Sequence, residues 1–153
     1  MQVKAIVIAQ TALALCLAAP ALAQVNVNLP WIRSTAPSQN TAAVFMKLEA
    51  HAAQGVALVG ASSPLAESVE LRGPGRTARG TGIARVEMRA GSSVLLKPGS
   101  THLLLRGLKQ PLRKGARVPL TLEFETGDAR RIAVNVEAEV VGASAKSALD
   151  HHH

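Results

Sequence analysis

The feature that most constrains the fold is strict alternation of apolar and polar residues on both sides of a short turn. From Val118 to Glu125 every second side chain is a large apolar one, and a period of two returns from Ile132 to Ala138. The segment 126–128, which holds a glycine, lies between them. A period of two places the apolar side chains on one face of a β-strand. The two segments therefore predict a β-hairpin with one buried face.

Shorter segments of the same kind precede this hairpin, and glycine or proline separates them at the spacing typical of a β-sandwich. No amphipathic helical pattern of useful length follows the first 23 residues. The sequence therefore predicts an all-β, antiparallel β-sandwich with Greek-key connections. The further strand segments are Val44–Glu49, Val56–Val59, Val69–Arg72, Ile83–Met88, Val94–Leu96 and His102–Leu105. Residues 72–85 are rich in glycine and arginine, which indicates an exposed basic loop or a loose hairpin.

The first 23 residues have the pattern of a secretory signal peptide. Lys4 precedes a short apolar run, and small residues end at Ala23, which predicts export to the periplasm with cleavage after Ala23. The alternative is an uncleaved anchor. Leu15 stands before Cys16, where a lipoprotein signal has a small residue, so we expect Cys16 to be removed with the signal. The exported chain would then contain no cysteine, which excludes disulfides and thiolate metal sites.

Residues 24–141 form one domain in this interpretation, and residues 142–153 form a flexible tail. The tail ends in His151, His152 and His153, which are either a natural metal-binding end or the remnant of an affinity tag. No second apolar run has the length of a membrane span, and we expect a monomer that is soluble after export.

The formal net charge of the whole chain is +7. Outside the cytoplasm this charge favours acidic proteins, surface polymers or lipid headgroups over nucleic acid as partners, or it is a solvated basic surface. The exported part has no Ser-His-Asp arrangement or pair of carboxylates that would indicate catalysis, so we do not expect an enzyme.

Eight segments of the chain carry a similarity to a known family through their order and spacing. They are Pro30–Pro37, Thr41–Met46, Leu58–Pro64, Val69–Leu71, Val86–Arg89, Leu96–Leu103, Gly107–Leu112 and Val118–Leu122. This order and spacing resemble the periplasmic copper chaperones of the PCu(A)C family, and the segment from Lys97 to Leu122 carries most of the similarity. The resemblance implies a cupredoxin-like sandwich that holds Cu(I) with two histidines and two methionines.

The resemblance places only part of that ligand set in this chain. Met88 and His102 stand at two of the family's ligand positions, whereas Arg72 and Leu104 replace the first histidine and the second methionine. Cu(I) is a soft ion suited to thioether and imidazole ligands. Leucine has no donor atom, and arginine stays protonated, so neither can coordinate the ion. A pair of Met88 and His102 would hold Cu(I) weakly unless another ligand joins it.

The missing ligand could come from His51 or from the three terminal histidines, which by themselves suit Cu(II) better than Cu(I). The first functional hypothesis is a copper-binding protein or chaperone that carries or buffers Cu(I) for envelope enzymes such as cytochrome oxidase, with an oxidase assembly protein as partner. The alternative is a metal-free binding module of the same fold that presents a basic face to an acidic protein or polymer. The residues of that face are Arg72, Arg76, Arg79, Arg85 and Arg89.

Overall fold

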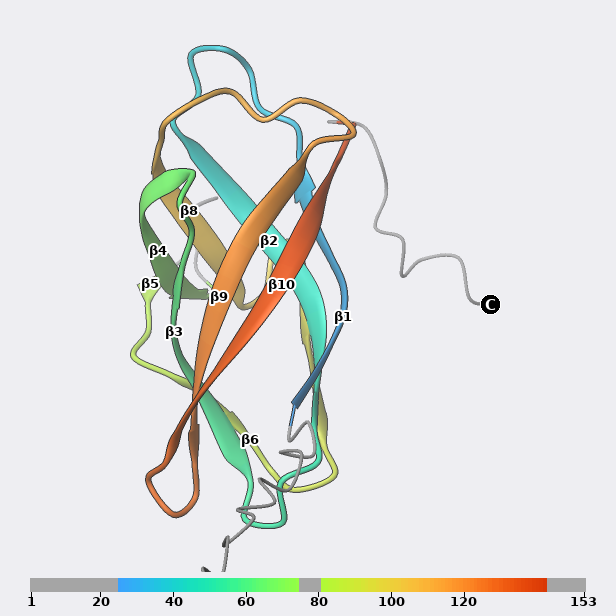
Figure 1. Ribbon diagram of the computed structural model, residues 1–153, viewed down its shortest axis with the longest axis vertical. Helices are drawn as coiled ribbons and strands as arrows, with labels where there is room; N and C mark the ends of the chain where they lie inside the picture. The colour runs from blue at the N-terminus through green and yellow to red at the C-terminus, as the bar shows by residue number, and fades with distance from the viewer. Residues whose placement is uncertain (1–24, 75–80, 143–153) are drawn as a thin grey trace, which may run out of the picture.

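The computed structural model describes residues 25–74 and 81–142, and every regular element within these ranges is a β-strand (Figure 1). This confirms the all-β prediction. The strands are β1 Val25–Arg33, β2 Thr41–Ala50, β3 Val56–Ser62, β4 Ala66–Gly73, β5 Thr81–Gly82, β6 Val86–Met88, β7 Ser93–Leu96, β8 His102–Leu108, β9 Arg117–Thr126 and β10 Arg131–Val141.

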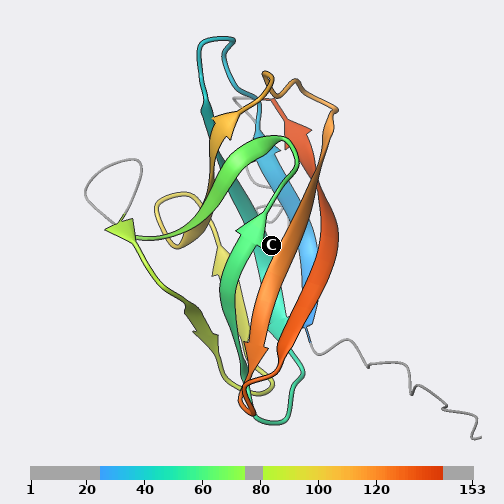
Figure 2. The same cartoon turned by 60° about the vertical axis from the view of Figure 1, so that its left-hand side comes forward.

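The strands form one sheet that curls into two facing layers. Its order is β5-β4-β8-β2-β1-β10-β9-β3-β6, and β7 also pairs with β2. Figure 1 shows β3, β9 and β10 in front of β2, β8 and β1, and Figure 2 shows β4 curving away from the front layer toward β5. The two layers enclose one apolar core. This arrangement is the sandwich that the spacing of the strand segments predicted.

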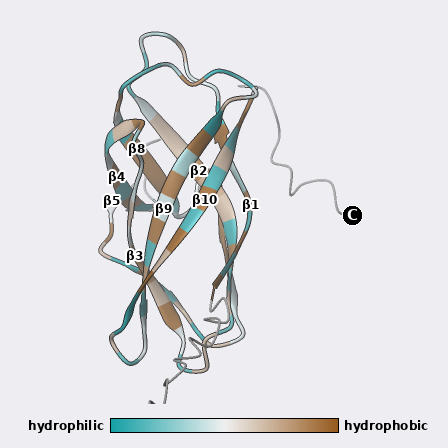
Figure 3. Cartoon of the chain, viewed as in Figure 1, coloured by the Kyte–Doolittle hydropathy of each residue, from teal (hydrophilic) through white to brown (hydrophobic). Residues whose placement is uncertain are grey.

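The predicted hairpin is β9 and β10, which pair from Arg117 opposite Glu139 to Glu125 opposite Arg131. Along β9 the side chains from Val118 to Thr126 are buried at every second position. The apolar and polar residues alternate visibly along both strands in Figure 3. The hairpin is therefore confirmed, with its apolar face against the core.

Strand β1 was not foreseen as a strand, although Val25 and Val27 alternate with two asparagines. A break in its register with β2 falls between Asn28 and Trp31, and Leu29 there has a φ of 48° and is exposed. This irregularity interrupts the period-two pattern, which is why the sequence did not indicate it. At its far end β1 pairs in parallel with β10. That pair, formed by the first and last strands, is the exception to the expected antiparallel arrangement.

The two ends of the glycine- and arginine-rich segment pair with each other as in a hairpin. Arg72 and Gly73 of β4 lie opposite Gly82 and Thr81 of β5. The second of the two predicted forms, a loose hairpin, is therefore found. Its tip, which includes Arg76 and Arg79, lies outside the described residues. The predicted signal peptide and the tail of histidines lie outside them as well. In the part of the chain that is described, no helix has the length and apolarity to cross a membrane.

Candidate functional site

His102 is the first residue of β8, and its side chain is buried with 5% exposed. Its Nδ1 lies 2.8 Å from the carbonyl oxygen of Ser100. Because a carbonyl oxygen only accepts, Nδ1 carries the proton and donates it. In the neutral ring Nε2 then has a bare lone pair. That Nε2 atom is buried and has no hydrogen-bond partner among the described residues, so its lone pair is unused.

The position of His102 follows from the alternation along β8. Leu103 and Leu105 are fully buried in the core, which places His102 and Leu104 on the opposite face of the strand. On that face an aromatic row crosses the sheet. The ring centroid of Phe45 on β2 lies 6.1 Å from that of His102 and 4.6 Å from that of Trp31 on β1. The histidine is therefore held at the side of an aromatic patch outside the main core.

A small cavity of about 230 Å³ is lined in part by His102. Two connections border it, with Thr35 and Gln39 before β2 and Pro98 and Gly99 before β8. Gly99 has a φ of 79°, a left-handed conformation that glycine adopts without strain. The turn at Pro98 and Gly99 therefore brings the backbone of Ser100 beside the imidazole.

Arg72 lies directly opposite His102 in the pairing of β4 with β8. Its guanidinium Nη2 forms an ion pair with Glu70, and the other oxygen of Glu70 accepts a bond of 3.0 Å from Arg106. Arg106, followed by Arg72, holds the pKa of Glu70 below its usual range. Arg72 is therefore held opposite His102 by an ion pair with a carboxylate.

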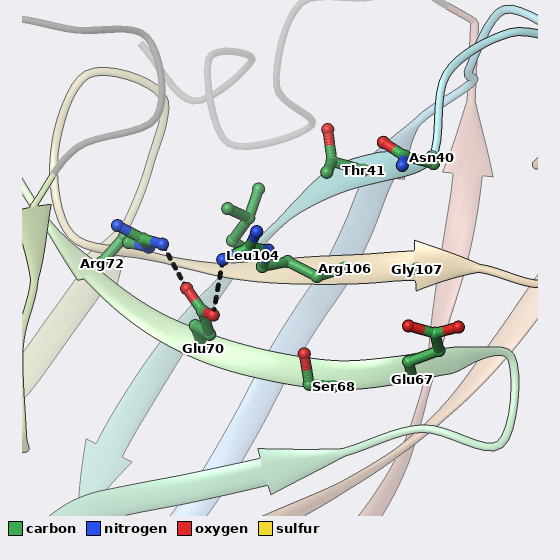
Figure 4. Close-up of a pocket in the computed structure, with 9 residues that line it drawn as sticks. All are labelled: Asn40, Thr41, Glu67, Ser68, Glu70, Arg72, Leu104, Arg106 and Gly107. Carbon is green, nitrogen blue, oxygen red and sulfur yellow. Dashed lines mark hydrogen bonds and ion pairs between the residues drawn. The ribbon is translucent and has the colours of Figure 1, made fainter.

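Figure 4 shows this ion-paired cluster in a pocket of about 740 Å³ on the outer face of β4 and β8. Glu70 lies between the two arginines, and Leu104 stands beside them without a donor atom. The Nε atom of Arg72 is buried and has no hydrogen-bond partner among the described residues. The pocket thus contains a fixed guanidinium with one unused N–H group.

The structure does not bring Met88 to His102. Met88 is a core residue of β6, 3% exposed, and pairs with Val56. The segment after it reaches β2 at Ala50, which accepts a hydrogen bond from the backbone of Gly91. His102 contacts β2 five residues earlier, at Phe45, which corresponds to roughly 16 Å along the strand. The thioether of Met88 is apolar and packs in the core, which accounts for the place of Met88 in the alternating pattern of β6.

His51 is also apart from His102. The Nε2 atom of His51 lies 3.2 Å from the side-chain amide of Asn26, just beyond the Ala50 end of β2. His151, His152 and His153 lie outside the described residues. Among the residues that the structure describes, no group of three or more His, Cys, Asp or Glu side chains could hold a metal.

The expected basic face is partly neutralised. Arg85 forms ion pairs with Glu87 at 2.6 Å and with Glu125 at 3.4 Å, and Arg72 pairs with Glu70. Arg89 is exposed. Glu70 and Arg106 were not among the residues predicted from the sequence. They alternate on the solvent side of β4 and β8, but only the register between these strands shows that they meet.

Comparison with known proteins identifies the class. The chain is 22% identical to the copper-bound PCuAC domain from PmoF2, covering 78% of this chain and 93% of that domain with a TM-score of 0.65. It is 31% identical to the Cu(I) form of DR1885 from Deinococcus radiodurans, covering 79% and 83% with a TM-score of 0.59. The fold is thus the cupredoxin-like fold of PCuAC domains, which confirms the resemblance seen in the sequence.

The family follows from the sequence matches. Residues 25–136 match the family described as putative lipoprotein LpqE-like. The chain is also 31% identical over 121 residues to the putative lipoprotein Lxx21020 of Leifsonia xyli subsp. xyli, covering 74% of this chain and 69% of that protein. The chain belongs to the LpqE-like family.

Proposed function

We propose that this protein is a copper-binding carrier of the cell envelope, not an enzyme, and that His102 is the ligand that anchors Cu(I). The observation that carries the proposal is the buried Nε2 of His102, which has a fixed tautomer and no partner among the described residues. Imidazole suits copper. The similarity to the Cu(I) form of DR1885 at 31% identity supports the same ion.

The cellular setting is part of the same proposal. The basic start and apolar run of residues 1–23 support export to the periplasm, and the lipoprotein descriptions of the family and of the Leifsonia protein support an envelope location. In that compartment the protein would carry or buffer copper for an enzyme such as cytochrome oxidase, with an assembly protein of its copper site as recipient.

Neither Leu104 nor Met88 supplies a second ligand beside His102. Leu104 has no donor atom, and Met88 lies in the core away from His102. The terminal histidines His151, His152 and His153 could supply neutral imidazoles to this site, and by themselves they suit Cu(II).

An anaerobic competition titration of Cu(I) against a chromophoric chelator tests the proposal. We would compare the protein with three variants. They are His102→Ala, Met88→Leu, and a variant in which all three terminal histidines are changed to alanine. We expect His102→Ala to abolish binding by the folded protein and Met88→Leu to leave it unchanged. Binding that survives His102→Ala in the variant without terminal histidines would contradict the proposal.

A gain-of-function variant sharpens this test. Leu104 lies two residues from His102 on the same face of β8, so Leu104→Met restores the His-x-Met pair of the PCu(A)C family with little change in volume. We expect tighter Cu(I) binding by about tenfold or more, which corresponds to about 1.4 kcal/mol. The gain should vanish when His102→Ala is added, because both ligands act on one ion.

A metal-free binding module is the second candidate function, and the ion pairs of Glu70 with Arg72 and Arg106 favour it. Arg72 stands where the resemblance to the PCu(A)C family expects a copper ligand, and these ion pairs make it part of a charged network. If the protein without its terminal histidines binds no Cu(I), and Leu104→Met does not create a site, this second candidate replaces the first.

A further inference from the structure

We propose that two copies of this chain associate through strand β10, whose open edge pairs antiparallel with the same edge of the second copy. The two-fold axis of this pair passes beside Val134. The sequence led us to expect a monomer, because alternation within a strand does not show whether a neighbour covers its edge. The inference goes beyond the proposed function, since it involves neither His102 nor a metal and is tested independently of copper binding.

The lower half of β10 has an open edge. One side of β10 pairs with β9 from Arg131 to Glu139, whereas the other side pairs with β1 only from Glu139 to Val141. The irregularity at Leu29 bends β1 away, and the residues of β1 that precede it pair with β2 alone. Figure 1 shows β1 and β10 separating toward the turn between β9 and β10. Among the described residues, no strand therefore pairs with this side of residues 131–137.

The hydrogen bonds of the paired sides show which backbone groups point to the open edge. The amide of Thr126 donates to the carbonyl of Arg130 at 2.9 Å, and the register with β9 continues from there without a shift. Backbone direction alternates along an antiparallel strand, so the even-numbered residues of β10 bond to β9. On the other side, the amide of Ser34 donates to the carbonyl of Val141, an odd-numbered residue, at 2.8 Å. The N–H and C=O groups at the open edge thus belong to Arg131, Ala133, Asn135 and Glu137.

The apolar side chains of β10 are incompletely covered at this edge. Their partners on β9 are at most 2% exposed, namely Leu120, Leu122 and Phe124. The side chains opposite them on β10 remain partly exposed although they pack against the same core, namely Ile132, Val134 and Val136. The difference arises because β9 lies between two strands and this part of β10 has a neighbour on one side. A strand added beside β10 would remove the remaining apolar surface from water.

The sequence of the open edge is self-complementary, which favours a second copy as its partner. When Val134 lies opposite Val134 of the second copy, Arg131 lies opposite Glu137 and Ile132 lies opposite Val136. Odd-numbered residues then face odd-numbered residues, so the open backbone groups of both copies meet. Arg131 and Glu137 are 64% and 61% exposed, and the ion pair that each makes within the chain has an N–O distance of 3.4 Å or 3.9 Å. Such exposed pairs are weak, so these charges can turn to the second copy.

The two ends of the sheet are built differently from this edge. They are β5, with two residues, and β6, with three, and very short edge strands are a common protection against pairing between molecules. The edge of residues 131–137 is longer and contains no proline, glycine, lysine or bulge. It is therefore suited to strand addition. An interface made of one strand pair is small, so we expect a weak dimer that forms at high protein concentration.

Sedimentation velocity of the exported protein from about 10 µM to about 1 mM tests for this dimer. We expect the sedimentation coefficient of wild type to rise with concentration. Ala133→Pro should keep it at the monomer value, because it removes one N–H group from the open edge and none that bonds to β9. Proline is tolerated at such positions of edge strands, and circular dichroism checks that the variant is folded. Ala133→Ser is the matched control, since it keeps the N–H group and should still associate.

Charge reversal tests the register without changing the backbone. Arg131→Glu and Glu137→Arg each place like charges opposite one another, so each should raise the dissociation constant of the dimer by about tenfold. The double variant restores opposite charges and should return the constant to within about threefold of wild type. Arg130→Glu is the control for net charge, because Arg130 lies in the turn before β10 and should change the constant little.

Amide hydrogen exchange locates the contact. The amides of residues 131, 133, 135 and 137 should become protected only at concentrations where the dimer forms. A sedimentation coefficient that stays at the monomer value overturns the proposal, and so does association that survives in folded Ala133→Pro. A double charge variant as weak as the single ones also overturns it. Protection of these amides that is equal at all concentrations does the same, because the chain would then cover its own edge.

Discussion

At the scale of single residues, Glu70 joins two arginines on neighbouring strands. Its carboxylate contacts Arg72 on its own strand and Arg106 on β8, and Arg106 is the main cause of its lowered pKa. A carboxyl whose pKa is lowered by folding stabilises the folded state above its ordinary pKa of 4.5. This contribution disappears as the pH falls through the lower pKa of the folded state, because protonation breaks the ion pairs.

We therefore expect the free energy of unfolding of wild type to fall between about pH 6 and pH 3 by more than that of Glu70→Gln. Urea denaturation at a series of pH values measures this difference. Arg106→Gln should also weaken the dependence, since it removes the main cause of the shift. Identical pH dependence in wild type and Glu70→Gln would show that the network contributes nothing to stability.

At the scale of elements, the connection between β2 and β3 packs against the end of β6. Gly55 in this connection has a φ of 76°, and its amide donates to the carbonyl of Ala52 at 3.1 Å. A Cβ atom on Gly55 would lie 2.9 Å from the carbonyl oxygen of Met88. Two features thus require glycine, namely the left-handed backbone and the close approach of a neighbouring strand.

The substitution Gly55→Ala should therefore destabilise the protein by more than the roughly 1–2 kcal/mol that a left-handed conformation costs a residue with a Cβ atom. Gly99→Ala is the matched control, because Gly99 has a φ of 79° and nothing lies within 4 Å of its would-be Cβ. Chemical denaturation measures both variants. Equal losses would indicate that the contact with β6 adds no cost.

At the scale of the whole molecule, the described domain follows a segment with the composition of a secretory signal. The relatives are described as putative lipoproteins, whereas Leu15 precedes Cys16 in this chain. A lipoprotein signal needs a small residue at the position of Leu15. A lipidated chain that begins at Cys16 and a chain cleaved after Ala23 would differ in their first residue and in mass.

We expect the exported protein to begin at Gln24 without lipid, as measured by mass spectrometry of the envelope fraction. Leu15→Ala is the informative variant, because it places a small residue before Cys16 and should produce a lipidated form that begins at that cysteine. A wild-type protein that already begins at a lipidated Cys16 would overturn the predicted cleavage after Ala23.

The sequence by itself determined the all-β fold class, the last hairpin and the resemblance to PCuAC domains. The period-two pattern around residues 126–128 predicted the hairpin of β9 and β10, and the order of short segments predicted the PCuAC fold. Both features can be seen along the chain itself. Alternation depends only on the geometry of one strand, and the order of the segments is their order in the sequence. Where a bulge breaks the alternation, as at Leu29 in β1, the strand was missed.

Only the tertiary structure decided what the candidate site contains. The register of β4 with β8 sets Arg72 opposite His102 and joins Glu70 to Arg106, and no pattern within either strand records that register. The structure likewise assigned Met88 to the core, although its place in the sequence resembled that of a ligand. The physical reason is that a ligand set consists of atoms from different strands, and their separation is fixed by strand pairing and packing.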